Sequence, residues 1–148
     1  MSSCFFCKLT KEIKKTGTCD SFIAELNNSY VILAGGQYFK GYCILFTKDH
    51  KEHLEKLPEK RQKELYADVL KAAGAVSKAF KPARLNYENL GNITHHIHWH
   101  IIPRYKNDPH KKLPIWQIPE KKRNIKLSDK EKRSRIELIK KNITKEYK

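Results

Sequence analysis

Histidines and apolar residues alternate in a short segment beyond the middle of the chain. Imidazoles occupy every second position from His96 to His100, and the positions that follow each of them are Ile97, Trp99 and Ile101. In an extended strand alternate side chains share a face, so the histidines project to one side and the apolar residues to the other. The segment therefore predicts a strand with one face in the core and one face lined by imidazoles.

Burying a row of ionisable rings costs free energy, because the rings lose their contact with water and repel one another when they are charged. A structural role alone therefore explains the row poorly. Two chemical roles fit the geometry. Imidazoles in register can converge on a metal ion. A neutral imidazole can also attack phosphorus while its neighbours fix its tautomer and contact phosphate oxygens. The residues alone leave both roles open.

The rest of the chain predicts an α+β fold, because runs of strand-like composition come before and after a long helical pattern. The runs rich in β-branched and aromatic residues cover residues 21–26, 30–34, 42–47, 85–90 and 96–105. Between the third and fourth, apolar residues from Leu65 to Phe80 follow a 3.6-residue period, which predicts a helix over residues 58–80. Residues 106–126 are rich in proline and are expected to be irregular.

A second helix is expected at the C-terminal end. Ser128 and Glu131 have the spacing of a capping box, and Ile136, Ile139 and Ile143 share one helical face. The sequence therefore predicts a helix that begins at Ser128.

Size and charge narrow the class of protein. The chain has 148 residues, the size of one ordinary domain, and no apolar run of membrane-spanning length or secretory signal. We therefore expect a cytoplasmic protein without a membrane partner. Its 31 Lys and Arg residues outnumber 16 Asp and Glu residues, for a net charge of +15, which favours anionic partners without specifying a reaction.

The segment from His96 to Ile102 resembles the signature of the histidine triad (HIT) superfamily, in which three histidines alternate with apolar residues. The following residues, Pro103 to Tyr105, are similar to the ending of bacterial members described as diadenosine-polyphosphate hydrolases. Further resemblances are the Cys4-x-x-Cys7 pair, the strand that leads to His50, and the single long helix. The resemblance implies a HIT-like antiparallel sheet of about five strands with one long helix and an additional C-terminal helix. It implies a HIT domain over residues 1–119 and a basic extension over residues 120–148.

The resemblance also implies roles for the triad. His98 would be the nucleophile that forms a nucleotidyl-imidazole intermediate, His100 would contact the phosphate and assist the leaving group, and His96 would order the site. Residues before the triad would bind nucleotide or phosphate, and these are Asn86, Gly91, Asn92 and Thr94. Many members have Gly-Gln-Ser or Gly-Gln-Thr there, whereas Ile93 cannot donate a side-chain hydrogen bond. The residue that often grips the ribose would fall near Gly35, which has no side chain.

In zinc-containing members a Cys-x-x-Cys pair joins two histidines. Here the resemblance gives the set Cys4, Cys7, His50 and His96. Two thiolates and two imidazoles form a tetrahedral zinc site without an open position, so the metal would be structural.

The implied function is cleavage of a nucleotide at its α-phosphate by a hydrolase or nucleotidyl transferase, with a dinucleoside polyphosphate as the first expected substrate. A nucleoside phosphoramidase or phosphorylase with the same triad is an alternative. A second alternative, a nucleic-acid-binding or deadenylating repair protein, is not favoured, because the basic residues after Ser128 alternate with Glu131 and Glu137 like an ordinary solvated helix face. Many relatives pair through the long helix and a neighbouring strand, so the resemblance also implies a homodimer. The small residues Ala72 to Ala75 would allow close helix approach, and they could equally pack on the chain's own sheet.

Overall fold

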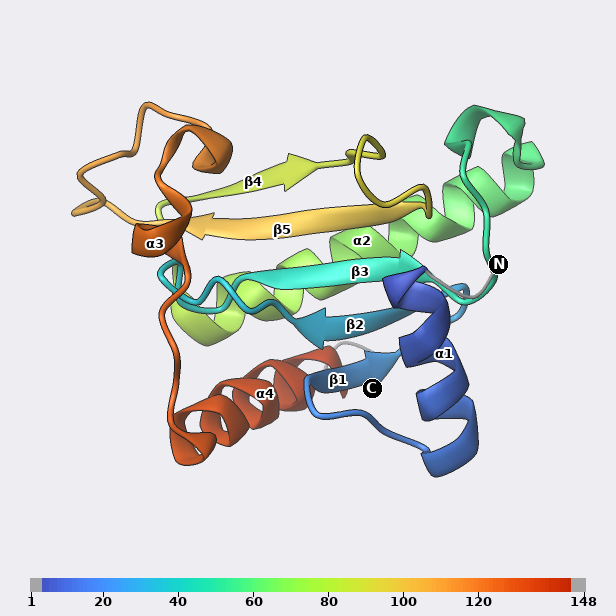
Figure 1. The fold of residues 1–148 in the computed structure, drawn as a ribbon, viewed down its shortest axis with the longest axis horizontal. Coiled ribbons are helices and arrows are strands. Elements are labelled where there is room, and N and C mark those ends of the chain that lie inside the picture. The colour runs from blue at the N-terminus through green and yellow to red at the C-terminus, as the bar shows by residue number, and fades with distance from the viewer. Residues whose placement is uncertain (1–3, 145–148) are drawn as a thin grey trace.

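The computed structural model describes residues 4–144 and contains one five-stranded sheet with helices on both sides (Figure 1). The helices are α1 (Phe5–Thr16), α2 (Glu59–Phe80), α3 (Glu120–Arg123) and α4 (Asp129–Thr144), and the 3-10 turns are η1 (Leu54–Lys56) and η2 (Ile115–Gln117). The strands are β1 (Phe22–Glu25), β2 (Ser29–Leu33), β3 (Cys43–Thr47), β4 (Arg84–Glu88) and β5 (His98–Arg104). The α+β class, the five strands, the long helix and the terminal helix are thus confirmed.

The sheet has the order β1-β2-β3-β5-β4, and every neighbouring pair is antiparallel. The connection that contains α2 carries the chain from β3 to the outer strand β4, and β5 then returns between them. In the resulting register Phe46 pairs with His98 and Ile44 with His100. The histidine strand is therefore a central strand, held on both sides by backbone hydrogen bonds.

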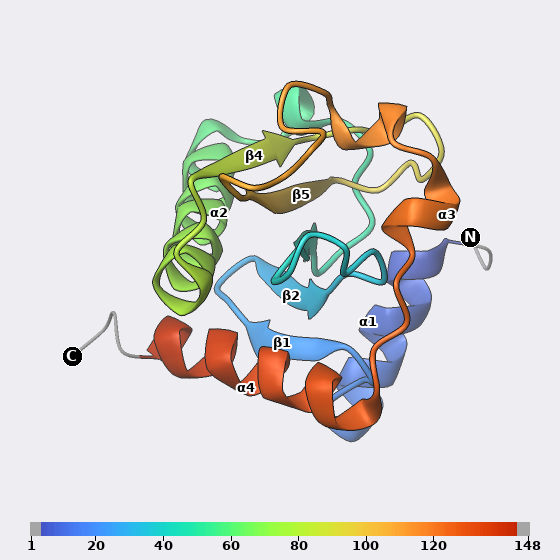
Figure 2. The same cartoon turned by 90° about the vertical axis from the view of Figure 1, so that its left-hand side faces the viewer.

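The two faces of the sheet carry different layers. Helix α2 covers one face, whereas α1 and the segment that contains α3 lie on the other (Figures 1 and 2). Trp99 and Ile101 of β5 are buried on the α2 side, in the main core with Leu65 and Val69. This is the alternation that the sequence predicts, and it leaves His98 and His100 on the opposite face.

The small residues of α2 pack in the core of the chain itself. Ala72, Ala73 and Ala75 are at most 2% exposed and belong to the main core. They let α2 lie close to the chain's own sheet, which is the second of the two roles that the sequence left open for them. The homodimer itself stays a prediction.

Helix α1 was not expected from the sequence, although its signals are present. Phe6, Thr10 and Ile13 recur at helical spacing and are buried, Lys14 and Lys15 lie in the last turn, and Gly17 ends the helix with a φ of 78°. Glycine adopts that left-handed conformation without strain. The helix packs Phe6 against Phe46, with ring centroids 4.7 Å apart, which fixes the N-terminal segment beside the histidine face.

The C-terminal helix follows the predicted cap. The Ser128 hydroxyl accepts a hydrogen bond from the Glu131 backbone at 3.3 Å, and the Glu131 carboxylate accepts one from the Ser128 backbone at 3.0 Å. Ile139 and Ile143 are buried in the main core, so α4 packs on the domain. Residues 106–126, expected to be irregular, contain the short turns η2 and α3, which begin after Pro114 and Pro119 because proline suits a helix start.

No helix within residues 4–144 combines the length and the apolar character that a bilayer crossing requires.

Candidate nucleotide site and metal centre

His98 is held in one tautomer by the backbone. Its Nδ1 lies 2.6 Å from the carbonyl oxygen of His96, and because a carbonyl only accepts, Nδ1 carries the proton and donates. The other nitrogen, Nε2, then carries a lone pair. Burial lowers the pKa of His98, so the ring is neutral at neutral pH. A neutral imidazole with an oriented lone pair is able to act as a nucleophile.

His100 is held by a side chain instead. Its Nδ1 lies 2.6 Å from the hydroxyl of Tyr42, and both side chains are buried. Burial, with the charge of His98 second, lowers the pKa of His100 to about 4, and burial raises the pKa of Tyr42. Both groups are therefore neutral at neutral pH. Because a phenol O–H is a stronger acid than an imidazole N–H, the Tyr42 hydroxyl is the donor and Nδ1 the acceptor. The proton of His100 is then on Nε2, which makes this ring a hydrogen-bond donor toward the open side of the site.

A cavity of about 420 Å³ opens onto these two rings. The residues that line it are Leu90, Asn92, Ile93, Thr94, His98, His100 and Trp116. Two residues predicted to bind phosphate, Asn92 and Thr94, are thus brought together with His98 and His100. Gly91 lies in the exposed turn beside them and does not line this cavity.

The structure does not bring Asn86 into this cavity. Its side-chain oxygen accepts a hydrogen bond at 3.0 Å from Arg104, which is buried and also bonded to Asp108. Asn86 pairs with Ile102, so it lies further along β5 than His100. Its amide therefore helps to hold Arg104 and the turn after β5 in place. The amide that contacts the triad strand is that of Asn89, which donates to the carbonyl of His98 at 2.7 Å.

The ring of His96 also points away from the cavity. Its Nε2 donates to the carbonyl oxygen of Thr47 at 2.8 Å, and its Nδ1 faces the sulfurs of Cys4 and Cys7. Both ring nitrogens are thus engaged outside the catalytic cavity. The contribution of His96 to the site is its backbone carbonyl, which orients His98.

Trp116 is a site residue that the sequence alone did not assign. Its ring lies 5.1 Å from that of His100 at 78°, an edge-on contact, and its indole nitrogen donates to the carboxylate of Glu88. Glu88 is paired directly with His100 across the β4–β5 ladder. Trp116 is 44% exposed although it is a large aromatic residue. It therefore presents an uncovered ring surface beside the rings of His98 and His100.

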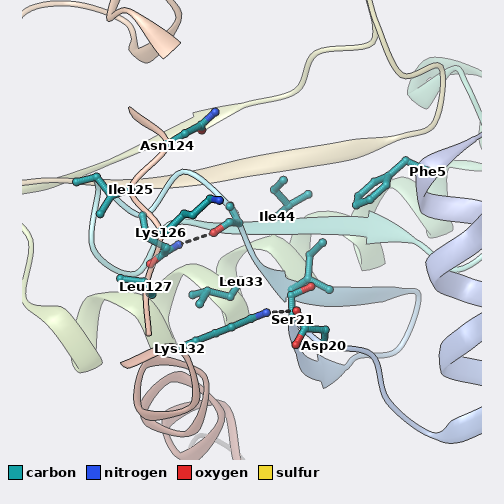
Figure 3. Close-up of a pocket in the computed structure, with 14 residues that line it drawn as sticks. Phe5, Asp20, Ser21, Leu33, Ile44, Asn124, Ile125, Lys126, Leu127 and Lys132 are labelled. Carbon is teal, nitrogen blue, oxygen red and sulfur yellow. Dashed lines mark hydrogen bonds and ion pairs between the residues drawn. The ribbon is translucent and has the colours of Figure 1, made fainter. Parts of the chain in front are cut away.

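A second cavity, of about 470 Å³, lies on the same face of the sheet near β2 and β3. Figure 3 shows Ile125 to Leu127 on one side of it and Ile44 on the sheet, with Phe5 at the other end. Because Ile44 pairs with His100 across the ladder, the two cavities lie beside each other. Mostly apolar walls with a few polar groups are typical of sites for small molecules.

The position expected to bind the ribose, Gly35, offers no polar side chain to this second cavity. Gly35 lines it, and nothing lies within 4 Å of the place where a Cβ would stand, so the position is open. Ser21 and Asp20 are the polar side chains at the base, and Asp20 is paired with Lys132 of α4 (Figure 3). The C-terminal extension therefore forms a wall of this cavity.

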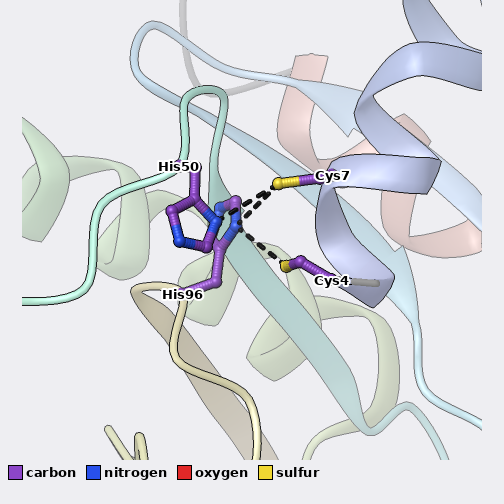
Figure 4. A group of neighbouring side chains, drawn as sticks. All are labelled: Cys4, Cys7, His50 and His96. Atoms are coloured by element: carbon purple, nitrogen blue, oxygen red, sulfur yellow. Dashed lines mark hydrogen bonds between the residues drawn. The ribbon is translucent and has the colours of Figure 1, made fainter. Parts of the chain in front are cut away.

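The second cluster of reactive side chains is the predicted metal set, which the fold brings together from three segments. Cys4 and Cys7 come from the start of α1, His50 follows β3, and His96 precedes β5 (Figure 4). One potential ligand atom from each of the four residues lies within 4.8 Å of the others. Among residues 4–144 this is the one group of three or more such side chains.

The donor set fits a tetrahedral zinc ion. Cys7 Sγ lies 3.3 Å from His50 Nδ1, and Cys4 Sγ lies 3.5 Å from His96 Nδ1, so the sulfurs and nitrogens already face one another. Each histidine donates its other nitrogen to an oxygen, His96 to Thr47 and His50 to Glu52 at 3.2 Å. Such contacts orient ligating imidazoles and leave Nδ1 free for a metal.

The cysteines differ in acidity. Burial acts to raise the pKa of Cys4, but hydrogen bonds from Cys7 outweigh it and the pKa is lowered. Burial and Cys4 raise the pKa of Cys7. The pair therefore loses its first proton at Cys4, and a bound cation would favour loss of the second.

Comparisons with known proteins agree with this geometry. The HIT domain family model matches residues 15–107. The adenosine 5'-monophosphoramidase hnt1 of Schizosaccharomyces pombe is 33% identical over 107 residues, covering 69% of this chain and 74% of that protein. The protein hit of Bacillus subtilis is 30% identical over 109 residues, covering 70% of this chain and 72% of that protein.

Solved structures show the same fold. A histidine triad protein from Bradyrhizobium japonicum has a TM-score of 0.75 at 22% identity, covering 89% of this chain and 94% of that one. A zinc-bound histidine triad family protein from Mycobacterium smegmatis has a TM-score of 0.69 at 19% identity, covering 97% of this chain and 94% of that one. With the triad, the five-stranded sheet and the family match in agreement, the chain belongs to the HIT family.

Proposed function

We propose that this HIT-family enzyme cleaves nucleotide conjugates at the phosphorus attached to the nucleoside, through a transient bond between that phosphorus and His98 Nε2. The observation that carries the proposal is the 2.6 Å hydrogen bond from His98 Nδ1 to the carbonyl of His96. It directs the lone pair of the ring to Nε2, and burial keeps the ring unprotonated by lowering its pKa. A nucleophile in this state needs no separate base to activate it.

The reaction then has two displacements. In the first, the Nε2 lone pair of His98 forms a bond to phosphorus, and the bond from phosphorus to the leaving group breaks with its electron pair. In the second, water attacks the same phosphorus, loses a proton and returns the bonding pair to Nε2, which releases a nucleoside monophosphate. The Nε2–H of His100 would donate a hydrogen bond that stabilises charge on the phosphate oxygens and on the departing group. The departing group takes up a proton from solvent, and the proton lost by the attacking water returns there.

The second cavity suits the nucleoside. Its walls include the apolar side chains of Ile32, Ile44 and Ile125, and it adjoins the catalytic rings on one face of the sheet. A base placed there would leave its 5' phosphate directed toward His98. The volume of about 470 Å³ lies within the range of small-molecule sites.

Two kinds of leaving group are proposed, and a different observation supports each of them. The 33% identical relative is named as an adenosine 5'-monophosphoramidase, which favours cleavage of a phosphorus–nitrogen bond. The exposed ring of Trp116 beside His100 favours a dinucleoside polyphosphate, because a second base could stack on it. Both substrates pass through the same intermediate on His98, so one enzyme can act on both.

A turnover assay tests the proposal. Purified protein would be incubated with adenosine 5'-phosphoramidate and with diadenosine tetraphosphate, and the release of adenosine monophosphate would be followed by chromatography. We expect release from at least one of the two. A second series with inorganic phosphate present distinguishes water from phosphate as the acceptor. Failure to cleave either substrate would exclude the proposed function.

We also propose that the cluster of Cys4, Cys7, His50 and His96 binds zinc. The fit of its donor set supports this, and so does the zinc-bound HIT structure from Mycobacterium smegmatis with the same fold. The ion would be structural, because four protein ligands leave no position for substrate. It would tie α1 to the segments that flank β3 and β5.

A homodimer is a further part of the proposal. Tyr66 and Leu70 are 57% and 54% exposed on α2, and Tyr87 is 47% exposed on the outer strand β4. Large apolar side chains grouped on one side of a domain favour association. Sedimentation equilibrium that gives the mass of one chain would exclude the dimer.

A further inference from the structure

The catalytic cavity lacks a cation. None of the seven residues that line it is a lysine or an arginine. Burial lowers the pKa of His100 to about 4, so this ring brings no positive charge at neutral pH, and the Nε2 of His98 presents a lone pair to the phosphate. The carboxylate of Glu88, across the ladder from His100, adds a negative charge nearby. A phosphate in this cavity would therefore meet no compensating charge from its walls.

Arg123, the last residue of α3, is the cation that lies beside this cavity. Its guanidinium carbon is 5.2 Å from the centre of the Trp116 ring, and that ring in turn contacts His100. A second sign of its position comes from Tyr42, the partner of His100. The backbone oxygen of Arg123 and the Tyr42 ring both lie 3.6 Å from the place where a Cβ of Gly36 would stand, so the end of α3 lies beside Tyr42.

The guanidinium is held by one nitrogen, and its other two nitrogens remain available. Arg123 Nε donates to the carbonyl of Ile118 at 2.8 Å, across the turn that leads into α3. Within residues 4–144 its terminal Nη groups have no hydrogen-bond partner, and the side chain is half-buried. A fixed guanidinium with free, parallel donors suits a phosphate, which accepts hydrogen bonds from both.

Arg123 also stands where the two cavities meet. Trp116 lines the catalytic cavity, and Asn124, the residue after Arg123, lines the second cavity. Figure 2 shows α3 and the segment that runs from it to α4 on the same side of the sheet as α1. A nucleotide with its nucleoside in the second cavity and its phosphorus at His98 must place the connecting phosphate at this boundary.

We propose that Arg123, which comes from the C-terminal extension, binds the phosphate attached to the nucleoside and is a substrate-binding residue of this enzyme. The inference rests on the proposed function and adds to it that the site recognises the charge of a nucleoside 5'-phosphate. Its positive charge supplies what the residues that line the cavity lack, both for binding the phosphate and for stabilising the charge that builds up during displacement.

The experiment compares Arg123→Gln with a variant that removes the same charge from the same short helix. Lys121→Ala is that control. Neither residue belongs to the lining of either cavity, but Lys121 is exposed on α3, whereas Arg123 lies against the Trp116 ring of the catalytic cavity. Two quantities are measured for each protein: kcat/KM with adenosine 5'-phosphoramidate and with diadenosine tetraphosphate, and the Kd of adenosine monophosphate and of adenosine by calorimetry.

We expect Arg123→Gln to lower kcat/KM about tenfold to a hundredfold for every substrate that the wild-type protein cleaves. It should weaken binding of adenosine monophosphate about tenfold and leave binding of adenosine unchanged. Lys121→Ala should stay within about twofold of wild type, since an exposed charge contributes little. Arg123→Lys, which keeps the charge but not the paired donors, should recover part of the loss.

Three results would overturn the inference. Equal behaviour of Arg123→Gln and Lys121→Ala would mean that Arg123 does not contact the phosphate. Equal losses of affinity for adenosine and adenosine monophosphate would mean that Arg123 only holds the cavity wall through Ile118. A loss confined to diadenosine tetraphosphate, with the phosphoramidate also cleaved, would place Arg123 on the leaving group. In all three cases the wild-type protein still turns over nucleotide, so the proposed function would survive.

Discussion

Tyr42 donates a hydrogen bond to His100, with 2.6 Å between the phenol oxygen and Nδ1. Because both groups are neutral, this bond decides which nitrogen of His100 carries the proton that faces the substrate. Tyr42 therefore acts through His100 and is a positioning residue.

Replacing Tyr42 with phenylalanine tests this role. Tyr42→Phe keeps the buried ring and removes only the donor, so His100 can adopt the other tautomer. We expect kcat to fall about tenfold with little change in KM. Nitrogen NMR of the histidine rings should show a mixture of tautomers for His100 in this variant. An unchanged kcat together with an unchanged NMR spectrum would show that the hydroxyl does not set the tautomer.

His98 is expected to be indispensable. His98→Ala removes the nucleophile, so turnover should fall at least about a thousandfold while binding of adenosine monophosphate remains measurable. His95→Ala is the matched control, because His95 is an exposed imidazole three positions earlier that does not line the catalytic cavity. It should retain activity close to that of wild type. Normal turnover in His98→Ala would remove the assignment of the nucleophile.

The metal proposal predicts that stability depends on zinc. Chelation should lower the Tm of the wild-type protein by at least about 5 °C, because binding energy of the ion contributes to folding. Cys7→Ser should start from a lower Tm and respond little to chelator. Metal analysis should give one zinc per chain.

The control for the metal site is His53→Gln, which removes an imidazole that is exposed and lies outside the cluster. It should keep the zinc and the chelator response of wild type. A wild-type Tm that chelator leaves unchanged, in protein that contains no metal, would contradict the proposal.

Much of this site was predictable from local sequence, because a strand places alternate residues on one face. That rule alone predicted the common face of His98 and His100, and the family resemblance predicted the four residues of the Cys/His cluster. The contacts of Tyr42 and Arg123 could not be predicted in this way. They depend on how β3 and the C-terminal segment lie against β5, which no periodicity within either segment expresses.

The differences between the expected and the observed positions of residues have equally specific causes. Asn86 was expected at the phosphate, but its position in the β4–β5 register places it beside Ile102. There its side-chain oxygen accepts a hydrogen bond from Arg104. His96 was expected to order the site and to belong to the metal set. Its carbonyl orients His98, and its ring lies before the first residue of β5 and turns toward Cys4. Helix α1 was missed although its apolar spacing and Gly17 cap could have been read from the sequence.

Acid should destabilise the fold through the histidines. Burial lowers the pKa of His100 from 6.5 to about 4, and it lowers those of His96 and His98 in the same direction. Between these pH values the unfolded chain binds protons that the folded chain does not, so stability is unaffected above pH 6.5 and falls as the pH decreases below it.

Urea unfolding at about pH 7.5 and pH 5 measures this effect above the range where most carboxylates titrate. We expect His100 alone to lower the free energy of unfolding by about 2 kcal/mol between these conditions. His100→Gln has no titrating group at this position and should lose less stability over the same range. Equal losses in the two proteins would show that His100 is not the group responsible.

The most direct test of the account is to trap the nucleotide on the protein. Wild-type protein would be mixed with radiolabelled adenosine 5'-phosphoramidate or diadenosine tetraphosphate, quenched in base, where phosphorus–nitrogen bonds on histidine survive, and digested for mass spectrometry. We predict an adenylate attached to His98 and to no other residue. Rapid turnover with no adduct at early times, or with an adduct on a different side chain, would contradict the proposed mechanism.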